Sequence, residues 1–432
     1  MRTLLRIAVR NLLGNRRRTL LLGGAIATVT AILVALTSLS NGMQATMLEV
    51  ATTLSTGHVN VAGFYKMTAT DATPMITEVP KLLEVVRAAD PDVQDIVLRG
   101  RGWGKLVSEK AKQEGVLVGI DIVNEASFRD VVRLVDGSFD ALKEPGTCLI
   151  FQGTADRLEV KAGDDVTVSA PTFRGSQNTA DCRIAAIAKD MGMMSSFSMF
   201  LHHQTLRDLY QMRDDQSGAM HIFVRNVERV DEIAAKLRTA IATAGFKVMD
   251  PVPEPFFRKF QGVAREDWTG QKIDVTTWSD EMAFMRYTLQ TFQVLTFVFV
   301  SILLGIVVLG VMNTMMMTIR ERTREIGTLR AIGMGRGSVL LMFVLEAAVL
   351  SVVATITGTL LGALTVVGID ALEIPVNKGF QMFLMSDTVH LLLDRGTAAV
   401  AVGVIATITT LSSLLPSWQA ARKPPVTAMS AS

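Results

Sequence analysis

Four long apolar runs constrain this chain more than any other feature of its sequence. They cover Leu20–Leu39, Tyr287–Ile319, Val339–Ile369 and Thr397–Pro416, and the only charge inside them is Glu346. A helix needs about 20 consecutive apolar residues to cross the hydrocarbon core of a bilayer. Each run is long enough, so the sequence predicts an integral membrane protein with four transmembrane helices.

Composition agrees with this prediction. Over 432 residues, 49% are apolar and 19% are charged, and the mean hydropathy is +0.35. The exception is the segment between the first two runs, which is rich in charge, Gly, Pro and Asp. That segment is long enough to bury a core of its own, so we expect it to fold as a water-soluble domain.

Basic residues predict the orientation of the spans. Six arginines precede the first run, five lie between the second and third runs, and Arg422 and Lys423 follow the fourth, whereas acids outnumber bases in the loop 370–396. By the positive-inside rule, both termini are cytoplasmic and the large domain is extracytoplasmic. A cleaved signal peptide is the alternative at the N-terminus, but an apolar run of about 20 residues exceeds the roughly 7–15 of a signal.

These patterns together predict the following organisation of the chain. It comprises a cytoplasmic amphipathic helix (1–19), the first span (20–41), an extracytoplasmic domain (42–285), the second span (286–319), a cytoplasmic coupling segment (320–338), the third span (339–369), a short extracytoplasmic loop (370–396), the fourth span (397–416) and a cytoplasmic tail (417–432).

The large domain is predicted to be of mixed α+β type. Alternating or β-rich runs indicate strands at 58–63, 116–121, 147–153, 165–170, 182–188 and 221–226. Helical spacing appears at 76–90, and again at 227–245, after which FKVMDPV (246–252) is predicted to be a strand. The last strand, helix and strand suggest a split βαβ unit.

Motifs for catalysis are missing from the sequence. It contains no G-x-x-x-x-G-K-[ST], HExxH, GxSxG or CxxC pattern. An enzyme is therefore the weakest functional class. The net charge of +2 gives no indication of nucleic-acid binding, because the arginines are explained by topology.

Two cysteines fall in the large domain, each in a predicted strand. A disulfide between Cys148 and Cys182 can persist in an oxidising compartment. The alternative is a pair of small, buried apolar side chains, and the sequence leaves both interpretations open.

Two stretches of the large domain are candidates for contact with a partner or cargo. In MGMMSSFSMFLHH (191–203), thioethers and imidazoles raise the possibility of a soft metal, but the spacing favours a flexible apolar surface or a strand. In 251–271, prolines are expected to break regular structure and aromatic residues offer anchors, although such loops usually pack on their own domain. The candidate contact residues are Met193, Met194, Phe197, Phe256 and Phe257.

Small residues recur every four positions in two of the spans. Such rows allow close approach of helix backbones, within one subunit or between two. The candidate packing residues are Gly23, Ala27, Ala31 and Ala35 in the first span, and Ala354, Gly358 and Gly362 in the third. Glu346 lies in the third span, where an ionised group needs a partner or water; a structural hydrogen bond or snorkelling is favoured over a proton relay.

The stretch TIRERTREIGTLRAIGMGRGS (318–338) is dense in charge between two apolar runs. As a helix it gathers Ile319, Thr323, Ile326 and Leu329 on one side and charged residues on the other. A basic loop that only obeys the positive-inside rule has no need of the glutamates. We therefore expect a surface helix that docks another protein.

This stretch resembles the cytoplasmic segment of FtsX-like and MacB-like ABC transporter permeases, of the mechanotransmission class. RERTREIGTLRAIGM (320–334) is similar to their pattern E-I-G-x-L-[RK]-A-[IL]-G, and PSWQAARKPPVTAM (416–429) is similar to P-x-x-x-A-A-R-x-x-P-x-x-A-L with Met429 in place of Leu. The basic N-terminus and Glu346 with its glycine-spaced span also match. Weaker similarities at 56–66, 118–121 and 153–168 look most like the lipoprotein-releasing subgroup, whereas 251–271 looks like an insertion.

The resemblance implies a mechanism and a set of partners. Such permeases form homodimers or heterodimers, and each subunit docks one of two ATPase chains, which bind ATP and Mg, so this chain itself is expected to hold no cofactor. The coupling residues implied here are Arg320, Glu321, Arg322, Arg324, Glu325, Ile326, Gly327, Leu329 and Arg330.

Two functions of different class follow from the resemblance. In the first, the chain is the inner-membrane permease of an exporter that extracts lipoprotein or hydrophobic cargo, with a periplasmic carrier or adaptor and membrane lipids as further partners. In the second, it is a signalling scaffold that regulates a cell-wall hydrolase. A membrane-anchored enzyme is disfavoured by the missing catalytic motifs.

Overall fold

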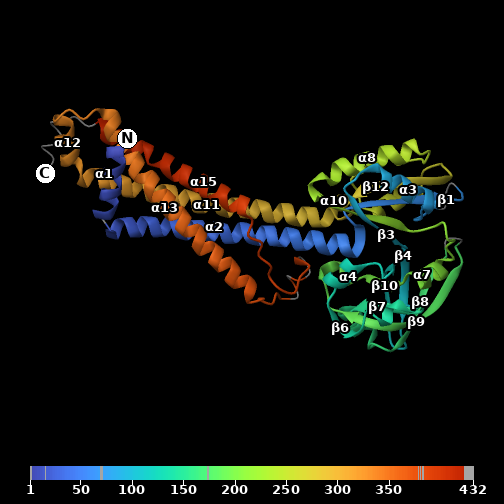
Figure 1. Ribbon diagram of the computed structural model, residues 1–432. Coiled ribbons are helices and arrows are strands. Elements are labelled where there is room, and N and C mark those ends of the chain that lie inside the picture. Colours follow the sequence, from blue (N-terminus) through green and yellow to red (C-terminus); the bar gives the residue numbers. More distant parts are fainter. Residues whose placement is uncertain are drawn as a thin grey trace. The chain divides into compact units, whose positions relative to one another are not determined.

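The structure is a computed structural model, which describes residues 2–14, 16–68, 72–172, 175–377, 379, 381 and 384–422. The chain divides into two compact units (Figure 1). The helical unit comprises Met1–Ala45, Leu289–Pro375 and Thr388–Ser432, and the α+β unit comprises Thr46–Thr288 and Val376–Asp387.

Within the described residues, four helices are long and apolar enough to cross a membrane. They are α2 (Arg16–Ala51), α11 (Ala283–Glu321), α13 (Arg336–Ala371) and α15 (Arg395–Ser412), the last continued by α16 (Leu414–Arg422). A separate helix, α1 (Arg2–Gly14), precedes them. The fold class is therefore as predicted: four membrane helices, with an α+β domain inserted between the first two.

The helices extend beyond the predicted spans. The first was predicted to end at residue 41, but α2 runs to Ala51 and continues as a π-helical turn, Thr52–Thr56. Gly57 ends it, with a φ of 63° that only glycine adopts readily. Within the predicted loop 370–396, Val376–Asp387 belongs to the α+β unit, where Lys189 pairs with Asp387.

One sheet of the α+β unit has the strand order β12-β1-β11-β3, with β2 (Ala72–Thr73) beside β1. Its strands are β1 (Val59–Lys66), β3 (Val93–Arg99), β11 (Ala219–Val224) and β12 (Gly270–Thr277). Neighbours in this order are antiparallel, so β1 and β3 run parallel with β11 between them. Because α3 (Val79–Ala89) connects β1 to β3, these elements form a split βαβ unit.

The split unit predicted around α8 is only partly present. Helix α8 (Val230–Thr243) forms as expected, and it buries an i, i+3, i+4, i+7 row that includes Ile233, Ala234 and Leu237. The strand predicted at 246–252 is wrong, since only Val248 forms an isolated parallel bridge to Ile273. Helices α3 and α8 pack their apolar faces with this sheet in a single core.

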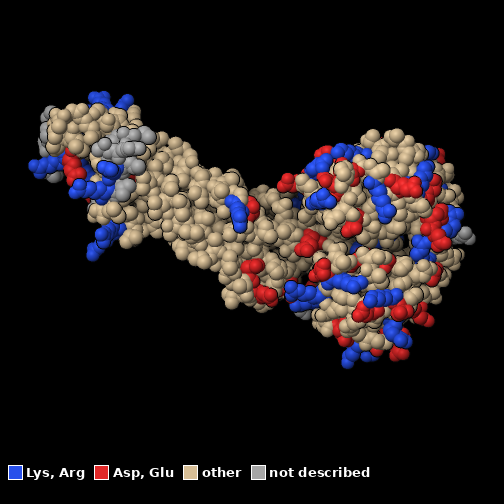
Figure 2. All heavy atoms as spheres, viewed as in Figure 1, with Lys and Arg blue, Asp and Glu red and all other residues tan. Residues whose placement is uncertain are grey.

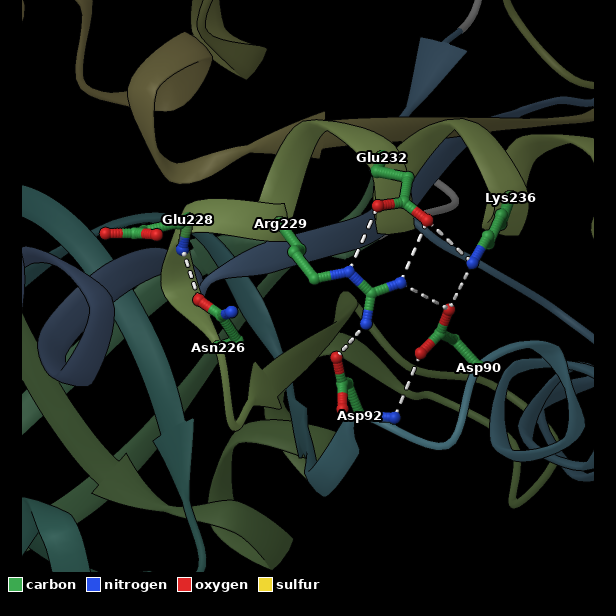
Figure 3. A network of polar contacts seen from close by, with 7 residues as sticks. All are labelled: Asp90, Asp92, Asn226, Glu228, Arg229, Glu232 and Lys236. Carbon is green, nitrogen blue, oxygen red and sulfur yellow. Dashed lines mark hydrogen bonds and ion pairs between the residues drawn. The ribbon is translucent and has the colours of Figure 1, made fainter.

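An ion network fixes the start of α8 beside β3 (Figure 3). Arg229 pairs with Asp92 and Glu232, while Lys236 lies 2.9 Å from Asp90. Hydrogen bonds from Lys236 lower the pKa of Asp90, and those from Arg229 lower the pKa of Glu232 to about 2. Both carboxylates are therefore ionised at neutral pH.

The second sheet closes on itself as a barrel. Its order is β6-β9-β7-β10-β5-β4-β8, and β9 also pairs with β8. The strands are β4 (Arg101–Val107), β5 (Lys112–Ile120), β6 (Leu134–Gly137), β7 (Thr147–Phe151), β8 (Asp165–Pro171), β9 (Gln177–Ala188) and β10 (Ser198–His202). The short helices around it are α4 (Ala126–Val131), α5 (Gln152–Leu158), α6 (Gly192–Ser195) and α7 (His203–Tyr210). Closure removes free strand edges and encloses a second core.

Arg99 joins the two sheets to the end of the first long helix. Its Nη1 donates to the Leu54 carbonyl at 2.8 Å, and its Nε donates to Glu125 Oε2 at 3.0 Å. Both charged side chains are 2% exposed. Removal of either one would leave the other charge buried without a partner, so we expect this joint to be rigid.

Candidate coupling site

The charged stretch folds as a short helix set off from the second span. Helix α11 ends at Glu321, and α12 spans Thr323–Ala331, with a break at Arg322, whose φ is −100°. Gly333, at a φ of 109°, follows the end of α12. The charged stretch is therefore not a continuous extension of the second span, and α12 is a separate element.

One face of α12 is buried against the rest of the helical unit. Ile326 is 4% exposed, and Thr323 and Gly327 beside it are also buried. Ile326 belongs to a core shared by α11, α13 and α16, whose members are Ile319, Ile326, Val339, Met342, Phe343, Ala420 and Ala421. A force applied to α12 is thus borne by three other helices.

A buried carboxylate strengthens this attachment. Glu346, in α13, is 1% exposed, and its oxygens lie 3.4 Å from Arg18 Nη2 and 3.6 Å from Arg322 Nη1. Arg18 also lies 3.7 Å from Glu321. Since an ionised group in an apolar bundle needs opposite charge, the arrangement ties the first span, the α11–α12 break and the third span together.

The opposite face of α12 is open. Arg324, Glu325 and Thr328 are exposed, and two apolar side chains stand among them. Leu329 is 37% exposed, although the sequence groups it on one side of the helix with the buried Ile326, and Ile332, just after the helix, is 80% exposed. Apolar residues flanked by charges on a fixed helix are suited to binding a protein partner.

The structure sorts the sequence-predicted coupling residues into two groups. Ile326 and Gly327 are buried, and Arg322 points to Glu346, so these three hold the helix in place. The residues Arg320, Glu321, Arg324, Glu325 and Leu329 are exposed, and Arg330 is half-buried. Sequence reasoning missed Arg18, which gave no signal apart from its neighbours Arg16 and Arg17, and it also missed Ile332.

The small-residue rows of the first and third spans face each other within one subunit. A Cβ built on Gly358 would lie 2.4 Å from the Ala27 carbonyl oxygen, and one on Gly362 would lie 3.0 Å from that of Ala31. A Cβ on Gly23 would meet Leu350 at 3.3 Å. Ala35 is half-buried and Ala354 is buried. The close approach of α2 and α13 therefore requires glycine in α13.

The candidate contact residues of the α+β unit are less exposed than the sequence suggests. Met194 and Phe197 are half-buried, and the side chain of Met193 lies outside the described residues. Their neighbours Met199 and Phe200 are fully buried in β10, so of the two interpretations of this stretch the strand is confirmed for Ser198–His202 and the flexible surface is not.

In the segment 251–271 the prolines lie in a stretch without helix or strand, 251–255, and a regular helix, α9 (Phe256–Val263), begins directly after them. Phe256 stacks on Phe64, with ring centroids 5.4 Å apart, and the Arg101 guanidinium lies over the Phe256 ring, 3.8 Å from its centroid. Phe256 therefore packs on its own domain. Phe257 is 65% exposed and remains available to a partner.

The two cysteines and the possible metal ligands can be placed among the described residues. Cys148 and Cys182 are free and buried in the barrel core. Their contact and their burial raise the pKa of the Cys148 thiol well above its usual value. Among the described side chains, no group of three or more His, Cys, Asp and Glu is arranged to hold a metal ion.

Two family profiles match the chain. Residues 297–425 match the family described as FtsX-like permease C-terminal, and residues 19–240, more than half of the chain, match the MacB-like periplasmic core domain. The first match contains α12 and Glu346. Pro425 of the C-terminal motif closes that match, while Ala428 and Met429 lie beyond it, and all three are outside the described residues.

Individual relatives match shorter segments. The macrolide export ATP-binding/permease protein MacB of Nitrobacter winogradskyi is 35% identical over 130 residues, covering 30% of this chain and 18% of that protein. The pyoverdine export ATP-binding/permease protein PvdT of Pseudomonas aeruginosa is 52% identical over 59 residues, covering 14% and 9%. The matches thus span less than a fifth of those relatives' length.

Among solved structures, the periplasmic region of MacB from Actinobacillus actinomycetemcomitans is 12% identical, covering 44% of this chain and 85% of that one, with a TM-score of 0.30. That score is too low to support an argument about the fold. The assignment rests on the two profiles, the four membrane helices and the inserted α+β unit. The chain therefore belongs to the family of permeases that join a MacB-like periplasmic core domain to an FtsX-like membrane region.

Proposed function

We propose that this chain is the membrane subunit of an ABC transporter, and that a separate ATPase chain docks on the open face of α12. The observation that carries the proposal is the two-sided character of α12: one face is locked to α11, α13 and α16, and the other presents Glu325, Leu329 and Ile332. ATP and Mg are bound by the partner, and two ATPase chains serve a dimer of permease subunits.

The proposed mechanism is mechanical. Closure of the ATPases on ATP moves α12, and the buried contacts of Ile326 and Glu346 pass that movement to the membrane helices. Helix α2 runs from the helical unit into the α+β unit, where Arg99 holds its final turn. A displaced span therefore moves the α+β unit without a channel through the bundle.

The orientation in this proposal follows the arginines. Arg320, Arg324 and Arg336 lie at the α12 end and are exposed, as the positive-inside rule expects for the cytoplasm. Both termini are then cytoplasmic, and the α+β unit is outside the inner membrane.

The proposed cargo is hydrophobic or lipidated. Relatives named for the export of macrolides and of pyoverdine support export over control of a cell-wall hydrolase. The exposed ring of Phe257 is a candidate contact for cargo, or for a carrier or adaptor protein. A lipoprotein is the narrower version of this proposal, supported by the sequence similarities in the large domain.

The docking part of the proposal is tested by purification from native membranes in mild detergent. The wild-type chain is expected to retain an ATP-hydrolysing subunit, and Glu325→Lys and Ile332→Asp are expected to lose it by about tenfold or more, as for residues at the centre of an interface. The matched control is Glu373→Lys, the same charge change on an exposed residue just after α13.

Retention of the ATPase by the control and its loss from both α12 variants supports docking on this face. Equal retention by all four proteins contradicts it, and so does the absence of any ATPase from the wild-type preparation. Size-exclusion profiles of the variants check that each protein is intact.

A further inference from the structure

The arginines before the first span fall into two classes. Arg18 is turned inward, with a side chain 22% exposed, and pairs with Glu346 and Glu321. Four of the others have described side chains, all of them exposed, and none of these four forms an ion pair with an acid that the structure describes: Arg6, Arg10, Arg16 and Arg17. The positive-inside rule predicts their side of the membrane but not this division.

The four unpaired arginines are held on a defined scaffold. Helix α1 packs on α13, and its Ala8 is fully buried. The Thr19 hydroxyl donates to the Leu12 carbonyl at 2.8 Å across the turn between α1 and α2. Within the helical unit, α1 crosses the start of α2 at a steep angle (Figure 1). A helix that runs across the direction of a span is suited to lie along the membrane surface.

Apolar side chains stand beside these arginines. Leu13 is 65% exposed, Leu20 is 73% exposed, and Leu21 is 77% exposed. Figure 2 shows basic residues gathered at this end of the bundle, next to a long stretch without charge on the face in view. Basic and apolar groups side by side at the beginning of a span match the boundary between headgroups and acyl chains.

We propose that α1 and its turn into α2 form a binding surface for anionic phospholipid headgroups, in which Arg6, Arg10, Arg16 and Arg17 contact the phosphates. The occupant is the bilayer rather than an acidic protein, because Leu20 and Leu21 open the span itself and so lie at the edge of the hydrocarbon. Unpaired guanidinium groups at an anionic surface gain Coulomb energy that zwitterionic lipid does not supply. The surface is separate from the open face of α12 and does not depend on the proposed ATPase.

The test uses a fluorophore beside the arginines. In Gly14→Cys the new Cβ meets no atom within 4 Å, and the two native cysteines are buried. The labelled full-length chain is placed in bilayers that contain an equal share of brominated phosphatidylglycerol or brominated phosphatidylcholine. Quenching by the anionic lipid is expected to exceed that by the zwitterionic lipid, with a preference on the order of fivefold.

The key variant changes all four unpaired arginines to Gln and is expected to remove the preference. The matched control changes four exposed arginines of the α+β unit to Gln and is expected to keep it; these are Arg87, Arg225, Arg258 and Arg265. A second measurement on the wild type needs no variant: about 1 M salt, where the Debye length is about 3 Å, is expected to reduce the preference strongly.

Equal quenching of the wild type by the two lipids overturns the proposal and leaves an acidic protein as the partner of the arginines. A preference that survives in the four-arginine variant overturns it as well. So does a preference that is insensitive to salt, since it would not come from exposed charges.

Discussion

Arg18 and Glu346, 328 residues apart in the chain, lie 3.4 Å from each other at the α12 end of the bundle. One comes from the start of the first span and the other from the third, and Arg322 approaches the same carboxylate at 3.6 Å. These ion pairs connect helices that are far apart in sequence. Their consequences can be tested without knowledge of the cargo.

Glu346→Leu is expected to destabilise the helical unit by roughly 2–4 kcal/mol, because it leaves two partly buried guanidinium groups without their counter-charge. The measurement is the thermal unfolding of the purified chain in detergent. In a double-mutant cycle, Arg18→Gln combined with Glu346→Gln should destabilise less than the sum of the single changes. Strict additivity would mean that the two side chains do not interact.

Gly358→Leu is expected to force α2 away from α13, since a Cβ at Gly358 already lies 2.4 Å from the Ala27 carbonyl. Overpacking of this kind costs about 1–3 kcal/mol and sometimes more. The unfolding midpoint in detergent should fall accordingly. Gly403→Leu, in α15, where an added Cβ meets no atom within 4 Å, is the control and should unfold near the wild-type midpoint. Similar midpoints for the two variants would argue against the α2–α13 seam.

His221 makes the α+β unit sensitive to mild acid. Burial, helped by the nearby Arg99 and Arg101, lowers the pKa of His221 well below 6.5, and the ring is 2% exposed. Below pH 6.5 the unfolded chain binds a proton that the folded chain excludes, so the free energy of unfolding falls as the pH drops. Denaturant unfolding of the full chain should show this slope between about pH 6.5 and 5, and His221→Gln should flatten it. An unchanged slope would show that His221 is not its source.

The ion network at the start of α8 makes stability depend on pH in a lower range than His221 does. Because the folded-state pKa of Glu232 is about 2, against 4.5 for the free side chain, its contribution is complete above about pH 4.5 and is lost towards pH 2. Glu232→Gln should therefore remove part of the acid dependence below pH 4.5 and leave the slope near pH 6 unaltered. Amide hydrogen exchange of α8 measures this acid dependence directly. An exchange profile of Glu232→Gln identical to that of the wild type would show that the network is not its source.

Sequence patterns predicted the parts of this molecule whose signal is local. Continuous apolar runs defined the membrane helices, and alternating or helical spacing defined β1, β11 and α8. The predictions failed where distant contacts decide. Nothing in the sequence distinguishes Arg18 from Arg17, and only the place of Glu346 in the fold selects it.

The same limit applies to the α+β unit and to α12. The closed barrel depends on β9 pairing with β8 as well as β7, and such pairings leave no mark in either strand alone. The stretch 191–203 suggested either a flexible apolar surface or a strand, and only the fold decides: it contains β10, with Met199 in the barrel core and Phe200 against Phe128 and Phe151. Leu329 has the spacing of the apolar side of α12, but its side chain is 37% exposed.

The cysteines permit a separate chemical test. Cys148 and Cys182 are buried and in contact, and the raised pKa of the Cys148 thiol predicts slow alkylation in the folded chain. Mass spectrometry of unreduced protein, alkylated before and after unfolding, should find two free thiols that react only after unfolding. A mass lower by two hydrogens would instead establish the disulfide that the sequence leaves open.

The central claim is that α12 transmits the work of an ATPase through the membrane, and one measurement addresses it most directly. ATP hydrolysis and release of cargo from proteoliposomes are measured together for the wild type and for Glu325→Lys, each reconstituted with an excess of the ATPase that co-purifies with the wild type. The account predicts normal membrane insertion of the variant, with cargo release reduced by about tenfold or more per ATP hydrolysed. Cargo release per ATP equal to that of the wild type would contradict it.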